Sequence, residues 1–177
     1  MEQKLTAKQV GEAINRLYAQ VLAHLPEEHA VAVVGIRTRG ETLAGRIAER
    51  LERDRPDLPV TYGVLDITFY RDDLSRRRGA PLVRATEIDF DLDDTWVLLV
   101  DDVLQTGRSI RAALDALADF GRPRIVRLAT LIDRGGRELP ISADFVGERI
   151  EVPPGHRVQV LLKETDGEEG VFIRERS

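Results

Sequence analysis

Hydrophobic positions in the first third of the chain switch between helical spacing and short continuous runs. Val10, Ile14 and Leu17 recur at helical spacing, which predicts an amphipathic helix over residues 7–25. Residues 30–36 then form an unbroken apolar run, which is typical of a strand buried on both faces of a sheet. The chain therefore begins with a helix on the surface of a core and a strand inside it.

The same switching continues to the end of the chain. Leu43, Ile47 and Leu51 predict a second helix, and the β-branched and aromatic residues of 60–69 predict a strand. Further elements are predicted as a strand over 96–100, a helix from Arg108 that ends before Gly121, a strand over 125–132, and strand-like runs at 158–162 and 171–173. Strands that alternate with helices predict an α/β fold with a mainly parallel sheet flanked by helices. Because no repeat or linker divides residues 1–177, we expect a single domain.

One polar segment interrupts this pattern. Residues 71–86 are charged and show neither helical nor strand periodicity. A loop of this length inside a compact domain is usually functional or disordered. We therefore treat the segment as a candidate part of a site.

Composition narrows the class of protein. With 42% hydrophobic residues the chain is expected to be globular, and without cysteine it has no disulfides and no cysteine metal sites. No apolar run approaches the roughly 20 residues of a membrane span, and no signal peptide follows the first residues. We expect a cytoplasmic protein without membrane contact.

The charge pattern limits how the chain could meet a polyanion. A formal charge of −5 argues against a protein that coats nucleic acid with its whole surface. All but three of the 26 basic residues are nevertheless arginines, whose planar guanidinium suits phosphate. Local phosphate sites therefore remain possible, although coding bias or thermal adaptation explains most of these arginines equally well.

The most unusual strand end follows residues 96–100. It delivers two adjacent carboxylates, Asp101 and Asp102, and then a short turn at a predicted helix start with Thr106, Gly107 and Ser109. A helix N-terminus offers free N–H groups and partial positive charge to an anion, and glycine lets the backbone come close. Carboxylates beside a phosphate cradle suit a ribose 5-phosphate. The alternative, a helix cap after an ordinary strand end, explains only one or two of these features.

A second strand end follows residues 30–36 and carries Arg37, Thr38, Arg39 and Gly40. The arginines supply charge-assisted donors, and threonine and glycine supply a hydroxyl and close backbone approach. Taken alone, this segment fits a second anion site and a turn with two solvated arginines equally well.

Residues 97–109 resemble the signature for 5-phosphoribosyl-1-pyrophosphate (PRPP) of type I phosphoribosyltransferases. That signature has four apolar residues, two acidic residues and a short run to Thr-Gly-Arg-Ser. The resemblance implies the type I phosphoribosyltransferase fold, with a small region that covers the base, and a pyrophosphate loop at residues 37–40. It also assigns one run to PRPP and UMP binding, namely Val103, Leu104, Gln105, Thr106, Gly107, Arg108 and Ser109.

Three further segments narrow the resemblance, at residues 35–40, 66–74 and 131–141. Together they make residues 33–147 similar to the PyrR family, bifunctional regulators of pyrimidine operons with uracil phosphoribosyltransferase activity. The resemblance implies that uracil and PRPP react to give UMP and pyrophosphate, and that leader RNA is bound in a UMP-dependent manner to attenuate transcription. It also implies that the loop over residues 71–86 folds over the bound substrates.

The resemblance suggests catalytic roles. Asp101 and Asp102 would hold the ribose and favour its cationic character, while Arg37, Arg39 and Arg71 would stabilise the departing pyrophosphate. Magnesium is the expected cofactor, held largely through PRPP, and the residues that would contact it are not identified. No residue is assigned as a general base.

Base and RNA contacts are suggested in the segment that follows residues 125–132. Asp133 and Arg134 are placed near uracil by the resemblance. Arg137 and Arg149 are predicted to contact RNA, because they flank a largely apolar stretch and are not needed by the ribose or pyrophosphate sites. We expect a homo-oligomer, a dimer or larger, that completes the RNA surface.

Several other functions remain open. The chain could act on a purine or orotate, or bind RNA and only sense UMP. It could also be an enzyme that has lost RNA binding, since the first helix region carries few basic residues (Lys4, Lys8 and Arg16) and the tail from Gly167 is mostly acidic. A response regulator is discounted, because its acidic pair follows the first strand and not a strand in mid-chain.

Overall fold

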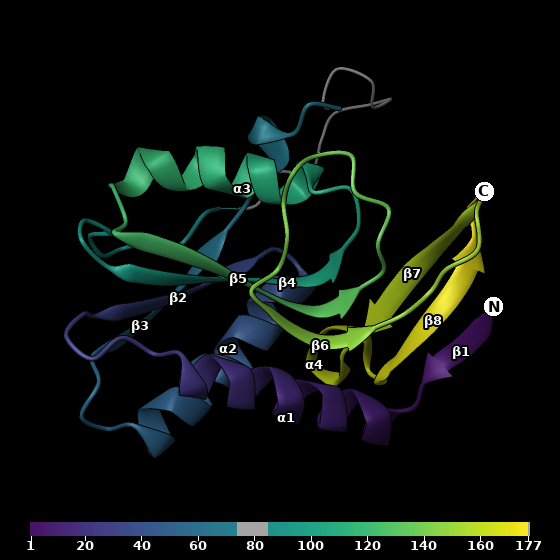
Figure 1. Ribbon diagram of the computed structural model, residues 1–177, viewed down its shortest axis with the longest axis horizontal. Coiled ribbons are helices and arrows are strands. Elements are labelled where there is room, and N and C mark those ends of the chain that lie inside the picture. Colours follow the sequence, from purple (N-terminus) through teal and green to yellow (C-terminus); the bar gives the residue numbers. More distant parts are fainter. Residues whose placement is uncertain (74–84, 177) are drawn as a thin grey trace.

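A computed structural model describes residues 1–73 and 85–176. Its main sheet has the strand order β3-β2-β4-β5-β6, and all four pairings are parallel (Figure 1). The strands are β2 (Val31–Ile36), β3 (Val60–Leu65), β4 (Trp96–Leu104), β5 (Ile125–Asp133) and β6 (Phe145–Arg149). Most of the loop predicted over residues 71–86 lies outside the described residues.

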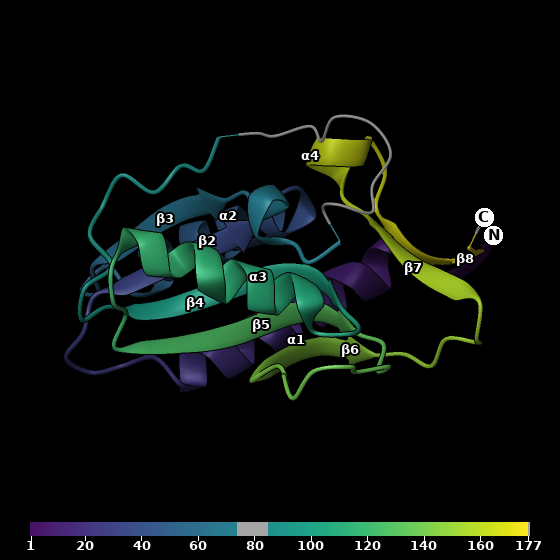
Figure 2. The same cartoon turned by 90° about the horizontal axis from the view of Figure 1, so that it is seen from above.

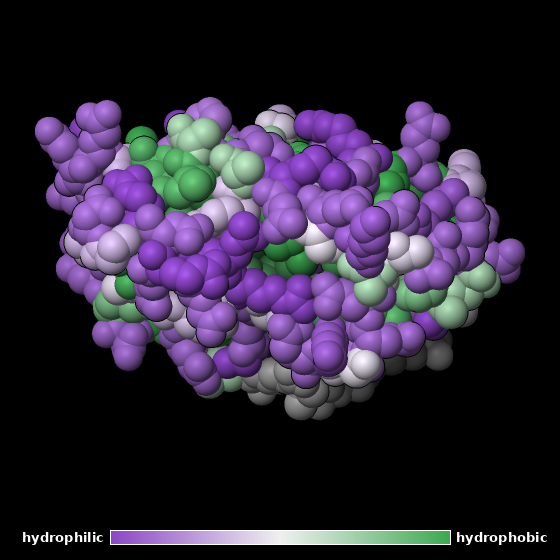
Figure 3. Space-filling view, turned by 90° about the horizontal axis from the view of Figure 1, so that it is seen from below, coloured by the Kyte–Doolittle hydropathy of each residue, from purple (hydrophilic) through white to green (hydrophobic). Residues whose placement is uncertain are grey.

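Helices cover both faces of the main sheet. On one face lie α1 (Ala7–Ala23) and α2 (Arg39–Asp54), and on the other lies α3 (Arg108–Leu117), with the short turns η1 (Thr68–Tyr70) and η3 (Ala118–Phe120) (Figures 1 and 2). All residues of β2 are buried, which explains its unbroken apolar run. Figure 3, from below, shows that the outer surface of the α1 and α2 layer is largely hydrophilic.

A second, antiparallel sheet stands beyond the carboxyl ends of the main strands (Figure 1). Its order is β1-β8-β7, with β1 (Glu2–Leu5), β7 (His156–Leu161) and β8 (Gly170–Glu175). The short helix α4 (Lys163–Asp166) connects β7 to β8. This small sheet overhangs the edge where the sequence places the candidate chemistry.

The observed elements differ from the predicted ones at their ends. α1 begins after a capping box formed by Thr6 and Gln9, and β3 stops at Leu65, four residues before the predicted end. β4 continues through Leu104, because its pairing with β5 extends beyond the apolar run. The acidic pair therefore lies inside a strand and not after it. Neither β1 nor β6 was predicted.

Two glycines let α2 pack directly against the sheet backbone. A Cβ on Gly35 would lie 2.5 Å from the carbonyl oxygen of Gly40, and a Cβ on Gly40 would lie 2.5 Å from the carbonyl oxygen of Val100. No side chain larger than hydrogen fits at either position without moving the backbone. The loop before α2 is thereby held against the strand that carries the acidic pair. None of the described helices is long and apolar enough to cross a bilayer.

Candidate active site

Asp101 and Asp102 occupy the last part of β4, and the Asp101 side chain is buried. Asp101 Oδ1 accepts the Asp102 N–H at 2.9 Å, and Asp102 Oδ1 accepts the Val103 N–H at 3.0 Å. Burial and then the Asp102 charge raise the pKa of Asp101 well above its ordinary value, and burial raises the pKa of Asp102. Within the described residues neither carboxylate has an ion-pair partner. The pair is thus well suited to ligand hydroxyls or a cation.

The turn between β4 and α3 is shaped for an anion. Gly107 has a φ of 91° and stands directly before α3, and a Cβ there would lie 3.2 Å from the Ile141 side chain. The Thr106 hydroxyl accepts the Arg108 N–H at 3.2 Å, and no side chain caps α3 from the Gly107 position. N–H groups in the first turn of α3 therefore remain available to a phosphate.

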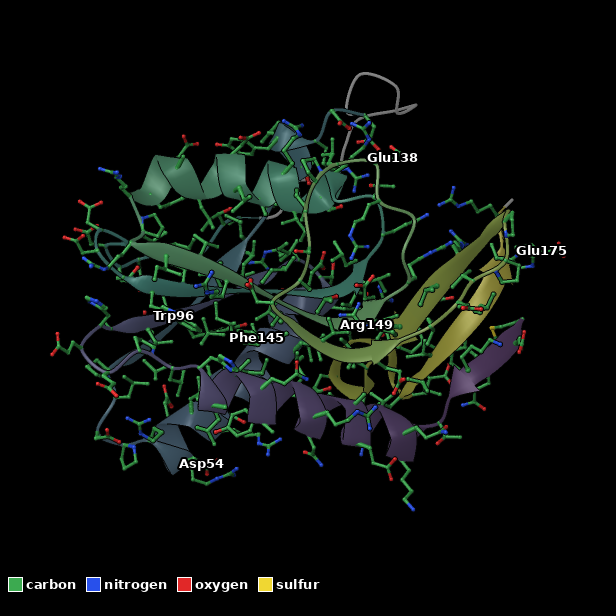
Figure 4. The ribbon with its side chains drawn as sticks, in the orientation of Figure 1. Asp54, Trp96, Glu138, Phe145, Arg149 and Glu175 are labelled. Atoms are coloured by element: carbon green, nitrogen blue, oxygen red, sulfur yellow. The ribbon has the colours of Figure 1, made fainter. Side chains whose placement is uncertain are left out.

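A cavity of about 700 Å³ opens over this turn. It is bounded by the acidic pair, by the turn and by side chains from other segments, which include Arg71, Asp72, Asp73, Glu138 and Val158. Figure 4 shows Glu138 in the loop that follows β5, near the start of α3. Arg108 joins this loop to the segment before residue 74, because it bonds Glu138 at 2.8 Å and Asp72 at 2.6 Å.

A second cavity, of about 400 Å³, adjoins the first. It is lined by residues 36–39, which run from the end of β2 to the start of α2, and by residues 66–68, which follow β3. Both cavities are lined by Arg71, Asp101, Asp102, Val103 and Ser109. The acidic pair therefore lies where the two cavities meet.

The junction of β2 and α2 brings two arginines to the second cavity. Arg37 bonds Glu41 at 3.0 Å and the Ala85 carbonyl at 2.9 Å, and Arg39 forms two bonds to Asp166 of α4, at 2.7 and 3.1 Å. The peptide bond between Arg37 and Thr38 is cis. Gly40 lines neither cavity, and its close approach is to β4. The contact of Arg39 with Asp166 ties the small sheet to the site and had no signal in the sequence.

Arg71 faces both cavities while it forms two bonds to Asp73, at 2.9 and 2.8 Å. Arg71 thus lines both cavities together with the acidic pair, and its contact with a departing anion stays a prediction. Other lining side chains were not predicted as site residues. These side chains include Asp66, Thr68 and Glu138. The only sequence signal for them was their position in the segments 66–74 and 131–141, which resemble the PyrR family.

Asp133, predicted to contact uracil, forms hydrogen bonds with both arginines predicted to contact RNA. Asp133, at the end of β5, is buried and accepts bonds from Arg137 at 2.8 Å, from Arg149 at 3.3 Å and from the Gly135 N–H at 3.0 Å. Burial disfavours the charged form, but the Arg137 bond and its companions outweigh it and lower the pKa of Asp133. Asp133 and Arg134 line neither cavity.

The two predicted RNA contacts have different surroundings. Every nitrogen of the Arg137 guanidinium has a partner, because it also donates to the carbonyls of Ile141 and Gln105, at 2.8 and 3.0 Å. Arg137 thus organises the loop after β5. Arg149 is 73% exposed at the end of β6 (Figure 4). Contact of either residue with RNA remains a prediction.

Comparison with known proteins identifies the family. A model described as "Phosphoribosyl transferase domain" matches residues 2–159. The "Bifunctional protein PyrR" of Roseiflexus sp. (strain RS-1) is 53% identical over 174 residues, which cover 97% of this chain and 94% of the relative. The chain belongs to the PyrR family. The protein of the same name from Deinococcus deserti is 48% identical, with 96% and 92% covered.

Solved structures agree on the fold of this PyrR-family chain. A hypoxanthine phosphoribosyltransferase from Trypanosoma cruzi has a TM-score of 0.70 and 17% identity, and covers 100% of this chain and 98% of its own. A hypoxanthine-guanine phosphoribosyltransferase from Bacillus anthracis has a TM-score of 0.68 and 15% identity, with 99% and 98% covered. The predicted type I phosphoribosyltransferase fold and the predicted PyrR family are confirmed.

Proposed function

We propose that this PyrR-family protein transfers the phosphoribosyl group of PRPP to uracil, and that it regulates pyrimidine operons by UMP-dependent binding of leader RNA. Its relatives carry the name of a bifunctional protein, and its domain is that of a phosphoribosyl transferase. The observation that carries the enzymatic half is the position of the acidic pair, at the junction of two cavities that each have anion-binding groups.

The three parts of PRPP match the three parts of this site. Its ribose belongs at the junction, where Asp101 and Asp102 accept bonds from the two ring hydroxyls. Its 5-phosphate belongs at the turn over residues 105–109, against the N-terminus of α3. Its pyrophosphate belongs in the second cavity, beside Arg37, Arg39 and Arg71.

The reaction breaks one bond and forms another at the anomeric carbon. Pyrophosphate departs with the electron pair of its C–O bond and positive charge develops on the ribose. A uracil nitrogen attacks from the opposite face, and its proton passes to the released pyrophosphate or to water. The paired carboxylates stabilise the cationic ribose, and the arginines stabilise the leaving anion. Most of the catalysis is positioning, because PRPP is already activated.

Magnesium fits this donor set as a partner of the substrate. Within the described residues no group of three or more His, Cys, Asp or Glu side chains could hold a metal on its own. The ion would be shared between PRPP oxygens and the carboxylates of Asp101 and Asp102, which lack a neutralising cation in the described part of the chain. Bound there, magnesium would screen the charge of the leaving pyrophosphate.

The position of uracil is less constrained. The proposed contacts at Asp133 and Arg134 have no support from the cavity linings, whereas Glu138 and Val158 face the first cavity. Transfer to another base is therefore the main enzymatic alternative. It would still use the ribose, phosphate and pyrophosphate segments described above.

One incubation tests the enzymatic half. Labelled uracil, PRPP and magnesium are mixed with the protein, and labelled UMP is expected. Parallel samples contain hypoxanthine, guanine, adenine or orotate in place of uracil. Product from one of these bases and none from uracil would contradict the assignment of the base, and no product from any base would contradict transferase activity.

The regulatory half is tested with a hairpin from the pyrimidine-operon leader RNA of the source organism. Retention on a filter is expected with UMP and is expected to be weaker without it. Failure to retain this RNA at low salt with UMP present would leave a plain phosphoribosyltransferase as the better description. The cytoplasmic location and the homo-oligomer are parts of the same proposal, and sedimentation measures the latter.

A further inference from the structure

Four arginines gather where the small sheet meets the end of β5. Arg157 of β7 and Arg174 of β8 are partners in the antiparallel register. Arg134 follows β5 and donates to the His156 carbonyl at 2.8 Å, while the Arg176 N–H donates to the Gly155 carbonyl at 2.8 Å. Figure 4 marks this end of the sheet by Glu175. We call these four residues, Arg134, Arg157, Arg174 and Arg176, the arginine group.

The arginine group differs from most other arginines of the chain in its pairing. Within the described residues none of its members has a carboxylate within 4.0 Å of its guanidinium, although many others do, such as Arg39, Arg46 and Arg108. Glu175 lies between two members in sequence but forms no ion pair with them in the described part, and adjacent strand residues point to opposite sides.

Two members of the group also have unused donors. The Nε atoms of Arg134 and Arg174 are buried and have no hydrogen-bond partner among residues 1–73 and 85–176. Burial and then the charge of Arg176 lower the pKa of Arg134, so these guanidinium groups disfavour one another. Buried donors without partners and clustered like charges both destabilise the folded state. A bound anion would accept hydrogen bonds from the donors and offset the positive charge.

The arginine group touches the nucleotide site. Arg176 donates to the side-chain oxygen of Gln105 at 3.1 Å, and Gln105 belongs to the turn that lines the first cavity. The backbone carbonyl of Gln105 accepts a bond from Arg137. A ligand in the first cavity and an anion on the arginine group would therefore both act on Gln105.

We propose that the arginine group is a phosphate-contacting part of the surface that binds RNA, and that Gln105 couples this surface to the nucleotide. This inference rests on the RNA-binding half of the proposed function, for which it supplies a location. RNA fits because the four guanidinium groups come from three segments that are far apart in sequence: the residue after β5, β7, and the end of the chain at β8. They therefore suit several phosphates of one backbone better than a single small anion.

The test compares two double variants that remove the same charge. Arg157→Gln with Arg176→Gln alters the two exposed members of the group. The matched control is Arg122→Gln with Arg124→Gln, because these exposed arginines also lack carboxylate partners in the described part and precede β5, at its opposite end. The leader hairpin is titrated against each protein with UMP, at two salt concentrations.

The wild type and the control are expected to bind the hairpin within twofold of each other. The Arg157/Arg176 variant is expected to bind at least about tenfold more weakly, with a salt slope smaller by about 1.4, or about 0.7 for each lost phosphate contact. If this variant binds the hairpin as tightly as the wild type, or if the control loses as much affinity as the variant, the assignment of RNA binding to the arginine group is overturned. Retention of duplex DNA of the same length as strongly as the hairpin would overturn the choice of RNA.

The coupling through Gln105 is tested with Arg176→Gln alone. UMP is expected to tighten RNA binding less in this variant than in the wild type, and RNA is expected to tighten UMP binding less by the same factor. An unchanged effect of UMP would overturn the coupling. Loss of RNA binding by the wild type is a separate outcome, since it rejects the regulatory half of the proposed function as well.

Discussion

Two buried aspartates at neighbouring strand ends have opposite electrostatic environments. Asp101 of β4 lies beside a second carboxylate and has a raised pKa, whereas Asp133 of β5 accepts two arginines and a backbone N–H and has a lowered pKa. Both follow or end apolar runs, and both were predicted as site residues. Asp101 thus has no cationic partner in the described part of the chain, whereas the charge of Asp133 is neutralised by arginines of the protein itself.

The difference indicates how to separate a binding carboxylate from a structural one. Burial without neutralisation costs stability, and it is retained where a ligand supplies the missing donors or charge. Burial with neutralisation stabilises the loop to which the partners belong. On this criterion we expect Asp101 to bind substrate, whereas the bond of Asp133 to Arg137 holds the loop after β5.

The largest expected effect is on stability. Asp133→Asn removes the charge that Arg137 and Arg149 share, so the free energy of unfolding should fall by about 2–3 kcal/mol. Urea denaturation measures this change, and the KM for uracil is measured on the same protein. A raised KM with unchanged stability would instead support the predicted contact with uracil.

A smaller expected effect concerns catalysis. Asp101→Asn should lower UMP synthesis by at least about tenfold, equivalent to roughly 1.4 kcal/mol, because the ribose loses one of its two carboxyl acceptors. Its stability should stay equal or rise, since a buried like-charge contact disappears. The control is Asp89→Asn, at an exposed position. Activity within twofold of the wild type would remove the ribose assignment.

A third carboxylate, Asp166, extends the comparison to an arginine of the site. Asp166→Asn removes the charge and one of the two acceptor oxygens that hold Arg39, so the KM for PRPP should rise about fivefold, or about 1 kcal/mol. Glu164→Gln is the matched control, because it removes the same charge from the same helix, where Glu164 contacts Arg46 in the middle of α2 and not Arg39. Tighter PRPP binding in the Asp166 variant would mean that this carboxylate competes with pyrophosphate.

The smallest expected effect is the dependence of stability on pH. The raised pKa of Asp101 means that the folded state binds more protons than the unfolded state just above the ordinary carboxyl pKa, so stability falls there as pH rises. The lowered pKa of Asp133 means that stability is lost as pH falls below the ordinary value. Asp101→Asn should flatten the first slope and Asp133→Asn the second. Denaturation midpoints across about pH 3–8 measure both.

Local patterns in the sequence predicted the parts of the fold that depend on local interactions. The apolar run over β2 reports burial, and the spacing of apolar residues over α1 reports a helix, each within a few residues. β1 has no such signal, because its stability comes from pairing with β8 at the far end of the chain. β6 was missed for a similar reason: it is short and pairs with β5 through residues such as Phe145 and Val146.

The candidate site shows the same division. Asp101, Asp102 and the turn to Ser109 are contiguous, so their chemistry could be seen in one segment. The pairing of Asp133 with Arg149 depends on register, since the two residues face each other across β5 and β6. The contact of Arg39 with Asp166 spans most of the chain. Neither contact could be inferred before the strands were placed.

The glycine contacts between α2 and the sheet have a consequence for ligand choice. Backbone lies against backbone at Gly35, Gly40 and Val100, so no side chain between the two substrate loops can change rotamer to alter their spacing. The distance between the acidic pair and the segment with Arg37 and Arg39 is therefore fixed, and it limits the length of ligand that can bind to both. A PRPP analogue of the same length should be accepted whatever its bridging atom, whereas one lengthened by a single phosphate should be rejected even though it carries more charge.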